Sequence, residues 1–236
     1  MFGHYYYYGF DIYYLIFILP AVIISLIAQV KVKSTFSKYS KVEAAITGAE
    51  AARRVLSSHG VTNVTIERVS GNLTDHFDPR TNVIRLSESV YNARTVAAVG
   101  VAAHEAGHAV QYAENYTPIV IRNKIVPLVN FASRSSWFIL ILGVALSIEP
   151  LLWAGIALFA LTTLFHLITL PVEFNASRRA IETIEGQYML GDNEANGAKR
   201  VLSAAAMTYV AALLVSLAQL LRFIMIFGRN RNRRNY

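Results

Sequence analysis

The chain has 236 residues, of which 54% are apolar and only 16% are charged, whereas an ordinary soluble domain has about a quarter of its residues charged. This balance excludes a typical soluble protein and predicts an integral membrane protein with one small polar domain. The chain has no cysteine, which excludes disulfides and thiolate metal sites, and its net charge of +7 comes from lysines and arginines that cluster beside apolar segments, as expected for contact with lipid headgroups rather than with nucleic acid.

The first apolar run covers residues 12–30 and is about long enough to span a bilayer. A cleaved signal peptide is the alternative interpretation. The first ten residues contain no lysine or arginine, however, and no small-x-small cleavage site follows the run. We therefore expect residues 1–33 to form an uncleaved transmembrane anchor.

Residues 34–124 form the polar part of the chain. Residues 47–58 have apolar positions at helical spacing and end before a His-Gly pair, which is typical of a helix stop. Residues 61–69 alternate in polarity and predict a strand. Residues 73–87 predict a β-hairpin, with Asp-Pro-Arg-Thr-Asn at its turn. We therefore expect a small α+β domain in this region.

The most informative stretch lies in the apolar run 96–110, which predicts a buried helix with Thr95 as its N-cap. This run contains the motif His104-Glu-Ala-Gly-His108. Residues four apart lie on the same side of a helix, so the two histidines can bind one metal ion, and Glu105 can act as general base on a metal-activated water. Coincidence is the alternative, but a chance match is expected in only about one such chain in a hundred or fewer.

Zinc fits this spacing, because hydrolytic zinc sites use three protein ligands and leave a fourth position for water.

Two further apolar runs, residues 125–146 and 151–170, are joined by only four residues. We expect residues 125–170 to form an antiparallel pair of spanning helices. The chain then returns, at residue 171, to the side of the membrane that carries the histidine motif.

The third ligand must come from another histidine or from a carboxylate. Glu173 stands directly after the returning span, in the helical segment 171–200, and we expect it to complete the site. The alternative for Glu173 is a charge that stabilises the N-terminus of this helix. An intramembrane His166 is better explained as a neutral side chain bonded to a neighbouring helix. The remaining histidines considered as ligands are His4, His59 and His76.

The fourth apolar run, residues 201–228, is interrupted by Gln219 and Arg222 and is either transmembrane or re-entrant. A basic tail follows at residues 229–236. The predicted fold is a mostly α membrane protein with four long apolar helices, the fourth being the least certain. A small α+β zincin-like domain carries the β-hairpin.

Together these motifs resemble the YugP-type membrane zinc metallopeptidases and, more distantly, the HtpX and CAAX prenyl protease group. The resemblance covers almost the whole chain, and its order is specific: a His-Glu-x-x-His helix, a membrane hairpin and then a second motif with a carboxylate. The segments that carry it are residues 28–34, 37–42, 73–79, 101–111 and 170–177.

The resemblance implies a zinc peptidase. In the HtpX-like group the carboxylate of the second motif is the third zinc ligand, which implies Glu173 here. The residue four positions later is commonly aspartate in that group and supports a zinc-bound histidine. This chain has Ser177 there, which is a weaker, neutral acceptor.

We therefore predict a membrane-embedded metalloendopeptidase, with one Zn²⁺ per chain, that hydrolyses membrane-associated proteins or peptides. Besides Ser177, the candidates for supporting the site or stabilising the oxyanion are His76, Arg179 and Tyr209. Residues 83–86 are a candidate edge strand for pairing with substrate, or an ordinary strand over the motif helix. The alternative functions are a non-catalytic membrane protein with a structural or regulatory zinc site, a transporter, and nucleic-acid binding by the basic tail.

The predicted location is the cell membrane, with several passes. Lysines and arginines flanking the polar domain favour a cytoplasmic position for it, and those of the basic tail favour the same side for the tail. Four full spans would place the polar domain and the tail on opposite sides of the membrane. We expect the site to face the cytoplasm; the conflict with the tail disappears if the fourth run is re-entrant or lies flat. Neither the substrate sequence nor the oligomeric state follows from the residues.

Overall fold

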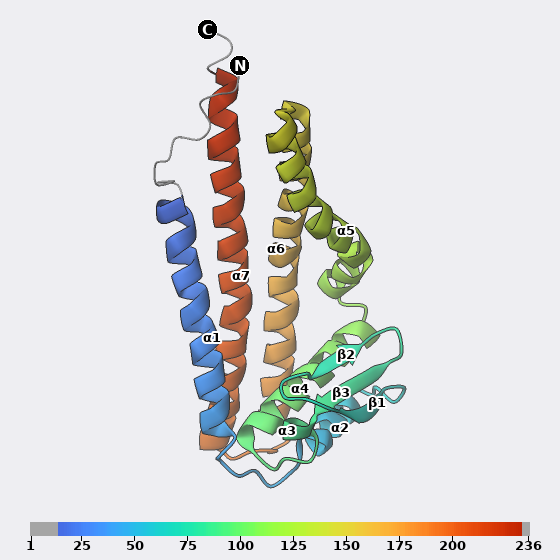
Figure 1. The fold of residues 1–236 in the computed structure, drawn as a ribbon. Helices are drawn as coiled ribbons and strands as arrows, with labels where there is room; N and C mark the ends of the chain where they lie inside the picture. The colour runs from blue at the N-terminus through green and yellow to red at the C-terminus, as the bar shows by residue number, and fades with distance from the viewer. Residues whose placement is uncertain (1–13, 233–236) are drawn as a thin grey trace. The chain divides into compact units, whose positions relative to one another are not determined.

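The computed structural model describes residues 14–232, with side chains described through residue 228 (Figure 1). The beginning of the predicted anchor, His4 and the end of the basic tail lie outside the described residues. The described chain is mostly helical and contains a three-stranded sheet, which confirms the predicted fold class. It divides into two compact units, the first made of residues up to 27, 122–168 and from 209 onward, the second of residues 28–121 and 169–208.

Within the described residues, four helices are long and apolar enough to cross a membrane. The first consists of a π-helical turn, η1 (Tyr14–Ile18), continued by α1 (Leu19–Tyr39). The others are α5 (Thr117–Leu146), α6 (Glu149–Gly186) and α7 (Asp192–Asn232). The fourth apolar run, the least certain from sequence, is therefore part of a helix with the length and composition of a span.

In the first unit, large apolar side chains are exposed, whereas two buried polar side chains form a hydrogen bond with each other. Phe131, Phe138 and Ile141 are each more than 60% exposed, as expected for side chains that contact lipid. Thr163 of α6 and Ser216 of α7 are both buried, and their hydroxyls form a hydrogen bond of 2.7 Å. Such bonds between helices are typical of membrane-spanning segments, where no water competes for the hydroxyl groups.

Helix α6 is longer than the sequence predicted. We expected a helix break at residue 170, but α6 continues through Pro171, whose ring removes one backbone hydrogen bond without ending the helix. Glu173 therefore lies in the interior of α6. The alternative interpretation, in which Glu173 stabilises a helix N-terminus, is wrong.

The second unit contains the sheet, formed by β1 (Thr65–Val69), β2 (His76–Asp78) and β3 (Val83–Ser87). Strands β2 and β3 are antiparallel neighbours, with Phe77 opposite Ile84, which confirms the predicted hairpin. Strand β1 pairs with β3 in parallel and begins later than the alternating sequence pattern suggested.

Strand β3 lies in the centre of the sheet, whose order is β1-β3-β2. Of the two interpretations of residues 83–86, the free edge strand is wrong, because β3 is paired on both sides. Strand β2 is an outer strand of the sheet in the described part of the chain, and it contacts α4 (Val96–Ala113). Figure 1 shows this strand beside α4.

Three shorter helices also belong to this unit: α2 (Gly48–Ser58), α3 (Glu88–Tyr91) and α4. The sequence predicted α2 and α4 but not the four-residue α3. The hydroxyls of Thr47 and Thr95 cap α2 and α4, each accepting a hydrogen bond from the backbone N–H three residues later. Both caps follow the usual preference for a threonine oxygen at a helix start. The N-cap prediction for the motif helix is confirmed.

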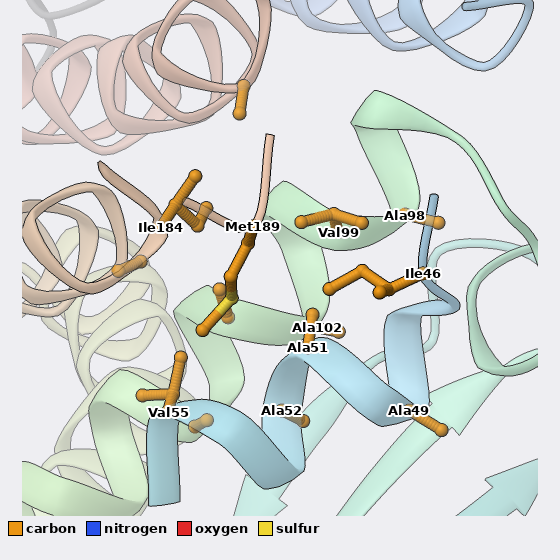
Figure 2. Packing of buried hydrophobic residues seen from close by; sticks show 14 of the residues in the cluster. Ile46, Ala49, Ala51, Ala52, Val55, Ala98, Val99, Ala102, Ile184 and Met189 are labelled. Atoms are coloured by element: carbon orange, nitrogen blue, oxygen red, sulfur yellow. The ribbon is translucent and has the colours of Figure 1, made fainter. Parts of the chain in front are cut away.

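The core of the second unit is built around small side chains of α2 and α4 (Figure 2). Ala51 and Ala52 of α2 and Ala102 of α4 are completely buried, so the two helices approach closely. Ile184, at the end of α6, and Met189 cover the same cluster. Interiors packed in this way resist displacement, so α4 is a rigid support for the side chains that it carries.

Candidate metal centre

Helix α4 presents the two histidines of the motif from a buried surface. Ala103 and Ala106, which flank His104 and Glu105, have no exposed surface, and His108 is only 8% exposed. The rings of His104 and His108 lie edge to face with centroids 4.7 Å apart. The helical spacing of four residues therefore brings the two imidazoles to one point, as the sequence predicted.

Glu173 of α6 reaches the same point. Its Oε2 atom lies 3.3 Å from Nε2 of His104 and 3.5 Å from Nε2 of His108. One ligand atom from each of the three residues lies within 4.8 Å of the other two. Glu173 is 2% exposed, so its carboxylate is held away from solvent and beside the imidazoles. Two nitrogens and one carboxylate oxygen are a donor set that suits zinc.

The close approach of α4 and α6 depends on Gly107, inside the motif. A β-carbon built on Gly107 would lie 2.7 Å from the carbonyl oxygen of Ala176, which is closer than real β-carbons come. Ala176 is itself completely buried. The absence of a side chain at residue 107 therefore lets α6 bring Glu173 to the histidines.

Each histidine has a hydrogen-bond partner on its second ring nitrogen. The Nδ1 atom of His104 lies 3.1 Å from the hydroxyl of Ser177, and the Nδ1 atom of His108 lies 3.0 Å from Oε1 of Gln111. Such partners orient the imidazoles of metal sites. Sequence reasoning considered Ser177 and missed Gln111, although a glutamine three residues after His108 in an apolar helix was an available signal.

Gln111 belongs to a larger buried set of polar groups that joins α4 to α6. Its Nε2 donates to the backbone oxygen of Val172 at 2.8 Å and to Oδ1 of Asn175 at 2.9 Å. Arg179 donates to the same Asn175 oxygen at 2.8 Å and forms an ion pair of 2.7 Å with Glu114. Arg179, a candidate for oxyanion stabilisation, is therefore bound to these two partners.

Glu105 is half-buried beside the ligand cluster. Burial raises the pKa of Glu105 to about 7, the negative charge of Glu173 adds to the rise, and His104 opposes it. A carboxyl group with a pKa near neutrality can both accept and release a proton under ordinary conditions.

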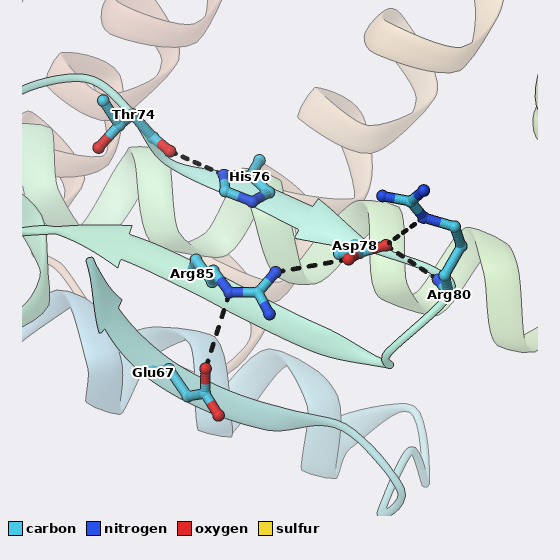
Figure 3. Close-up of polar contacts among 6 residues, drawn as sticks. All are labelled: Glu67, Thr74, His76, Asp78, Arg80 and Arg85. Atoms are coloured by element: carbon cyan, nitrogen blue, oxygen red, sulfur yellow. Dashed lines mark hydrogen bonds and ion pairs between the residues drawn. The ribbon is translucent and has the colours of Figure 1, made fainter. Parts of the chain in front are cut away.

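Asp75 and His76 lie close enough to Glu105 to act on it electrostatically. Asp75 accepts hydrogen bonds from the backbone N–H of Ser87 at 2.7 Å and from its hydroxyl, and burial raises the pKa of Asp75. On β2, the Nδ1–H of His76 donates to the backbone oxygen of Thr74 at 2.8 Å (Figure 3). The strand next to the motif helix thus carries an exposed imidazole with a defined orientation.

The other candidates do not belong to the ligand cluster. Tyr209 and His166 belong to the first unit, whereas the ligand cluster belongs to the second. His59 terminates α2, with its Nδ1 atom 3.0 Å from the backbone oxygen of Val55. On the sheet, Arg85 pairs with both Asp78 and Glu67 (Figure 3).

The described residues contain a group of two histidines and one glutamate that could hold a metal ion, and four helices long and apolar enough to cross a membrane. This combination is the one expected of a membrane-associated metalloprotein. The chain belongs to the family described as "Putative neutral zinc metallopeptidase", whose model matches residues 14–228. It is 54% identical to the "Putative membrane protease YugP" of Bacillus subtilis (strain 168) over 209 residues, which cover 87% of this chain and 93% of that protein. No solved structure matches the chain significantly.

Proposed function

We propose that this protein is a membrane-embedded, zinc-dependent endopeptidase that hydrolyses membrane-associated proteins or peptides. The observation that carries the proposal is the convergence of His104, His108 and Glu173, with ligand atoms within 4.8 Å of one another. These three residues would hold one zinc ion. A zinc ion with three protein ligands activates water and polarises a carbonyl group.

Glu105 is the proposed general base. It directly follows His104 on α4, and the charges of both His104 and Glu173 act on it electrostatically. In the proposed reaction Glu105 takes a proton from the attacking water and passes that proton to the amine of the leaving peptide. A pKa of about 7 suits both steps, because the group must first accept and then donate.

His76 is the proposed donor to the oxyanion of the tetrahedral intermediate. Among the sequence candidates, Arg179 is already bound by Asn175 and Glu114. The Nδ1–H of His76 is directed to Thr74, so His76 can donate to a substrate oxygen only as the imidazolium, in which Nε2 also carries a hydrogen. Such a donor acts most strongly where charge develops in the transition state.

The outer strand β2 is the proposed substrate edge. It contacts α4, the helix that carries the catalytic motif, and pairs with β3 on one side. An extended peptide can add to the other side of such a strand through main-chain hydrogen bonds. His76 lies on this strand, so a peptide bound there would pass close to the proposed oxyanion donor.

The test is metal content and peptide cleavage by the purified full-length protein, compared with Glu105→Gln. We expect about one zinc ion per chain in both proteins and a loss of cleavage of about 10²–10⁴-fold in the variant. The matched control is Glu182→Gln, which changes an exposed carboxylate of α6 paired at 3.9 Å with Arg178. Full cleavage by Glu105→Gln would remove Glu105 from the mechanism, and zinc without cleavage in the wild type would favour a structural or regulatory metal site.

We also propose that the metal centre faces the cytoplasm. Basic residues flank the segment that carries the centre on both sides, at Lys31, Lys33, Arg122 and Lys124, and such residues are enriched on the cytoplasmic side of membrane proteins. Reporter fusions after Gly60 and at the C-terminus test this orientation. A reporter at Gly60 that is active only outside the cytoplasm would contradict it.

A further inference from the structure

A continuous path of polar contacts leads from the exposed Glu114 to the proposed zinc ligand His108. Glu114 pairs with Arg179, whose Nε donates to Asn175 at 2.8 Å. Asn175 accepts from Gln111 at 2.9 Å, and Gln111 lies 3.0 Å from Nδ1 of His108. The path crosses twice between α4 and α6, and its central side chain, Gln111, is completely buried.

The direction of each hydrogen bond in this path follows from its chemistry. A guanidinium group can only donate, so the oxygen of Asn175 must face Arg179. That oxygen, and the backbone oxygen of Val172, can only accept. The nitrogen of the Gln111 amide must therefore face both of them, at 2.9 Å and 2.8 Å respectively.

The orientation of Gln111 then determines the tautomer of His108. With its nitrogen turned to Val172 and Asn175, the amide presents its oxygen to Nδ1 of His108 at 3.0 Å. An amide oxygen only accepts, so Nδ1 must carry the hydrogen. The lone pair of the neutral ring is then on Nε2, the atom 3.5 Å from the Glu173 carboxylate in the ligand cluster.

We infer that Arg179, Asn175 and Gln111 are positioning residues that set His108 in its metal-binding tautomer before any metal arrives. This inference rests on the proposed function, because it concerns the same metal centre. His104 offers an internal comparison: its partner is the hydroxyl of Ser177, at 3.1 Å, which can donate as well as accept. The protein therefore imposes the tautomer of His108 and leaves that of His104 open.

The most direct test needs neither metal nor a variant. Nitrogen NMR of ¹⁵N-histidine-labelled, metal-free, full-length protein, in an alkaline buffer at about pH 8.5 where free imidazole is neutral, distinguishes the two tautomers of each ring. His108→Asn assigns the His108 signals by their disappearance. We expect His108 to be present as the Nδ1–H form. A predominant Nε2–H form, or an even mixture, would overturn the inference.

Variants then test the path at increasing distance from the ring. Gln111→Leu removes the acceptor and should release the tautomer of His108. Arg179→Met removes the donor that orients Asn175 and should have a smaller effect in the same direction, whereas Arg179→Lys retains a donor and should restore the wild-type signals. The matched control is Arg178→Met, at the exposed neighbouring position of α6. A Gln111→Leu protein with unchanged His108 signals would contradict the path.

Zinc titration of the same proteins separates this inference from the proposed function. Loss of a partner that orients a zinc histidine typically weakens metal binding by about 10–100-fold, and we expect this for Gln111→Leu. Zinc affinity unchanged by Gln111→Leu would overturn the positioning role even if peptides are cleaved. A fixed His108 tautomer in a protein that binds zinc but cleaves no peptide would support the inference and refute the endopeptidase.

Discussion

Gly107 of α4 lies against the backbone of Ala176 of α6, so closely that an added β-carbon would come within 2.7 Å of the Ala176 carbonyl oxygen. Residue 107 directly precedes one proposed ligand, His108, and Ala176 lies three residues after another, Glu173. The contact therefore controls the distance between the two helices that supply the metal ligands. The glycine matters here because of the space that it leaves empty.

Gly107→Ala should consequently destabilise the protein and weaken metal binding. Alanine favours the helix by up to about 1 kcal/mol, but a methyl group forced into a closely packed contact costs about 1–3 kcal/mol, and backbone at 2.7 Å cannot move aside easily. We expect a lower melting temperature and weaker zinc binding. Gly186→Ala is the control, since an added β-carbon there meets no atom within 4 Å. Equal behaviour of the two variants would show that the contact is unimportant.

Glu173→Gln should reduce zinc affinity while leaving the fold intact. The amide has nearly the shape of the carboxylate but lacks its negative charge, and a neutral oxygen is a poor ligand for Zn²⁺. We expect at least about a tenfold loss of affinity, which corresponds to about 1.4 kcal/mol. Calorimetric titration of metal-free protein measures it. Wild-type affinity in this variant would exclude Glu173 as a ligand.

Metal removal should lower the thermal stability of the wild-type protein. A ligand that binds only the folded state at a free concentration of 100 times its dissociation constant stabilises that state by about 2.7 kcal/mol. We expect zinc to raise the melting temperature of chelator-treated protein, and to raise it much less in His108→Asn. An equal shift in both proteins would indicate that the stabilising zinc binds elsewhere.

Asp75→Ala should destabilise the hairpin next to the motif helix. Asp75 accepts hydrogen bonds from both the backbone N–H and the hydroxyl of Ser87, which is completely buried. Loss of the carboxylate removes the hydrogen-bond partner of the Ser87 backbone N–H, at a cost of about 1–3 kcal/mol, whereas the hydroxyl keeps its contact with Ser89 at 3.1 Å. Denaturant unfolding measures the change. Glu67→Ala, which removes an exposed partner of Arg85 at 3.7 Å, should change the unfolding free energy by less than about 1 kcal/mol.

The helical part of the structure was largely predictable because its signals are local. Apolar runs, helix caps such as Thr95 and the turn of the β2–β3 hairpin depend on neighbours within a few residues. The continuation of α6 through Pro171 was not predicted. A proline disfavours a helix locally, but the packing of the surrounding helix outweighs the loss of one hydrogen bond.

The candidate site was predictable only in part. The spacing of His104 and His108 follows from helix geometry, and the proximity of Glu173 was inferred from the return of the chain after the hairpin. The partnership of Gln111 with Asn175 was not inferred, since those residues are 64 positions apart. The pairing of Arg179 with Glu114 was not inferred either, and it explains why this candidate oxyanion donor is already bound to another side chain.

The amino-acid sequence by itself determined the apolar spans, the caps of helices such as α4 and the two histidines on one helical face, because each depends on residue type and short spacing. The order of the motifs along the chain indicated the zinc peptidase family. Only the tertiary structure decided which strand forms the edge of the sheet, how closely Gly107 lets α6 approach α4, and which buried polar groups face His108. The physical reason is that a buried hydrogen bond requires partners whose positions are set by the packing of distant segments, and no local preference encodes that packing.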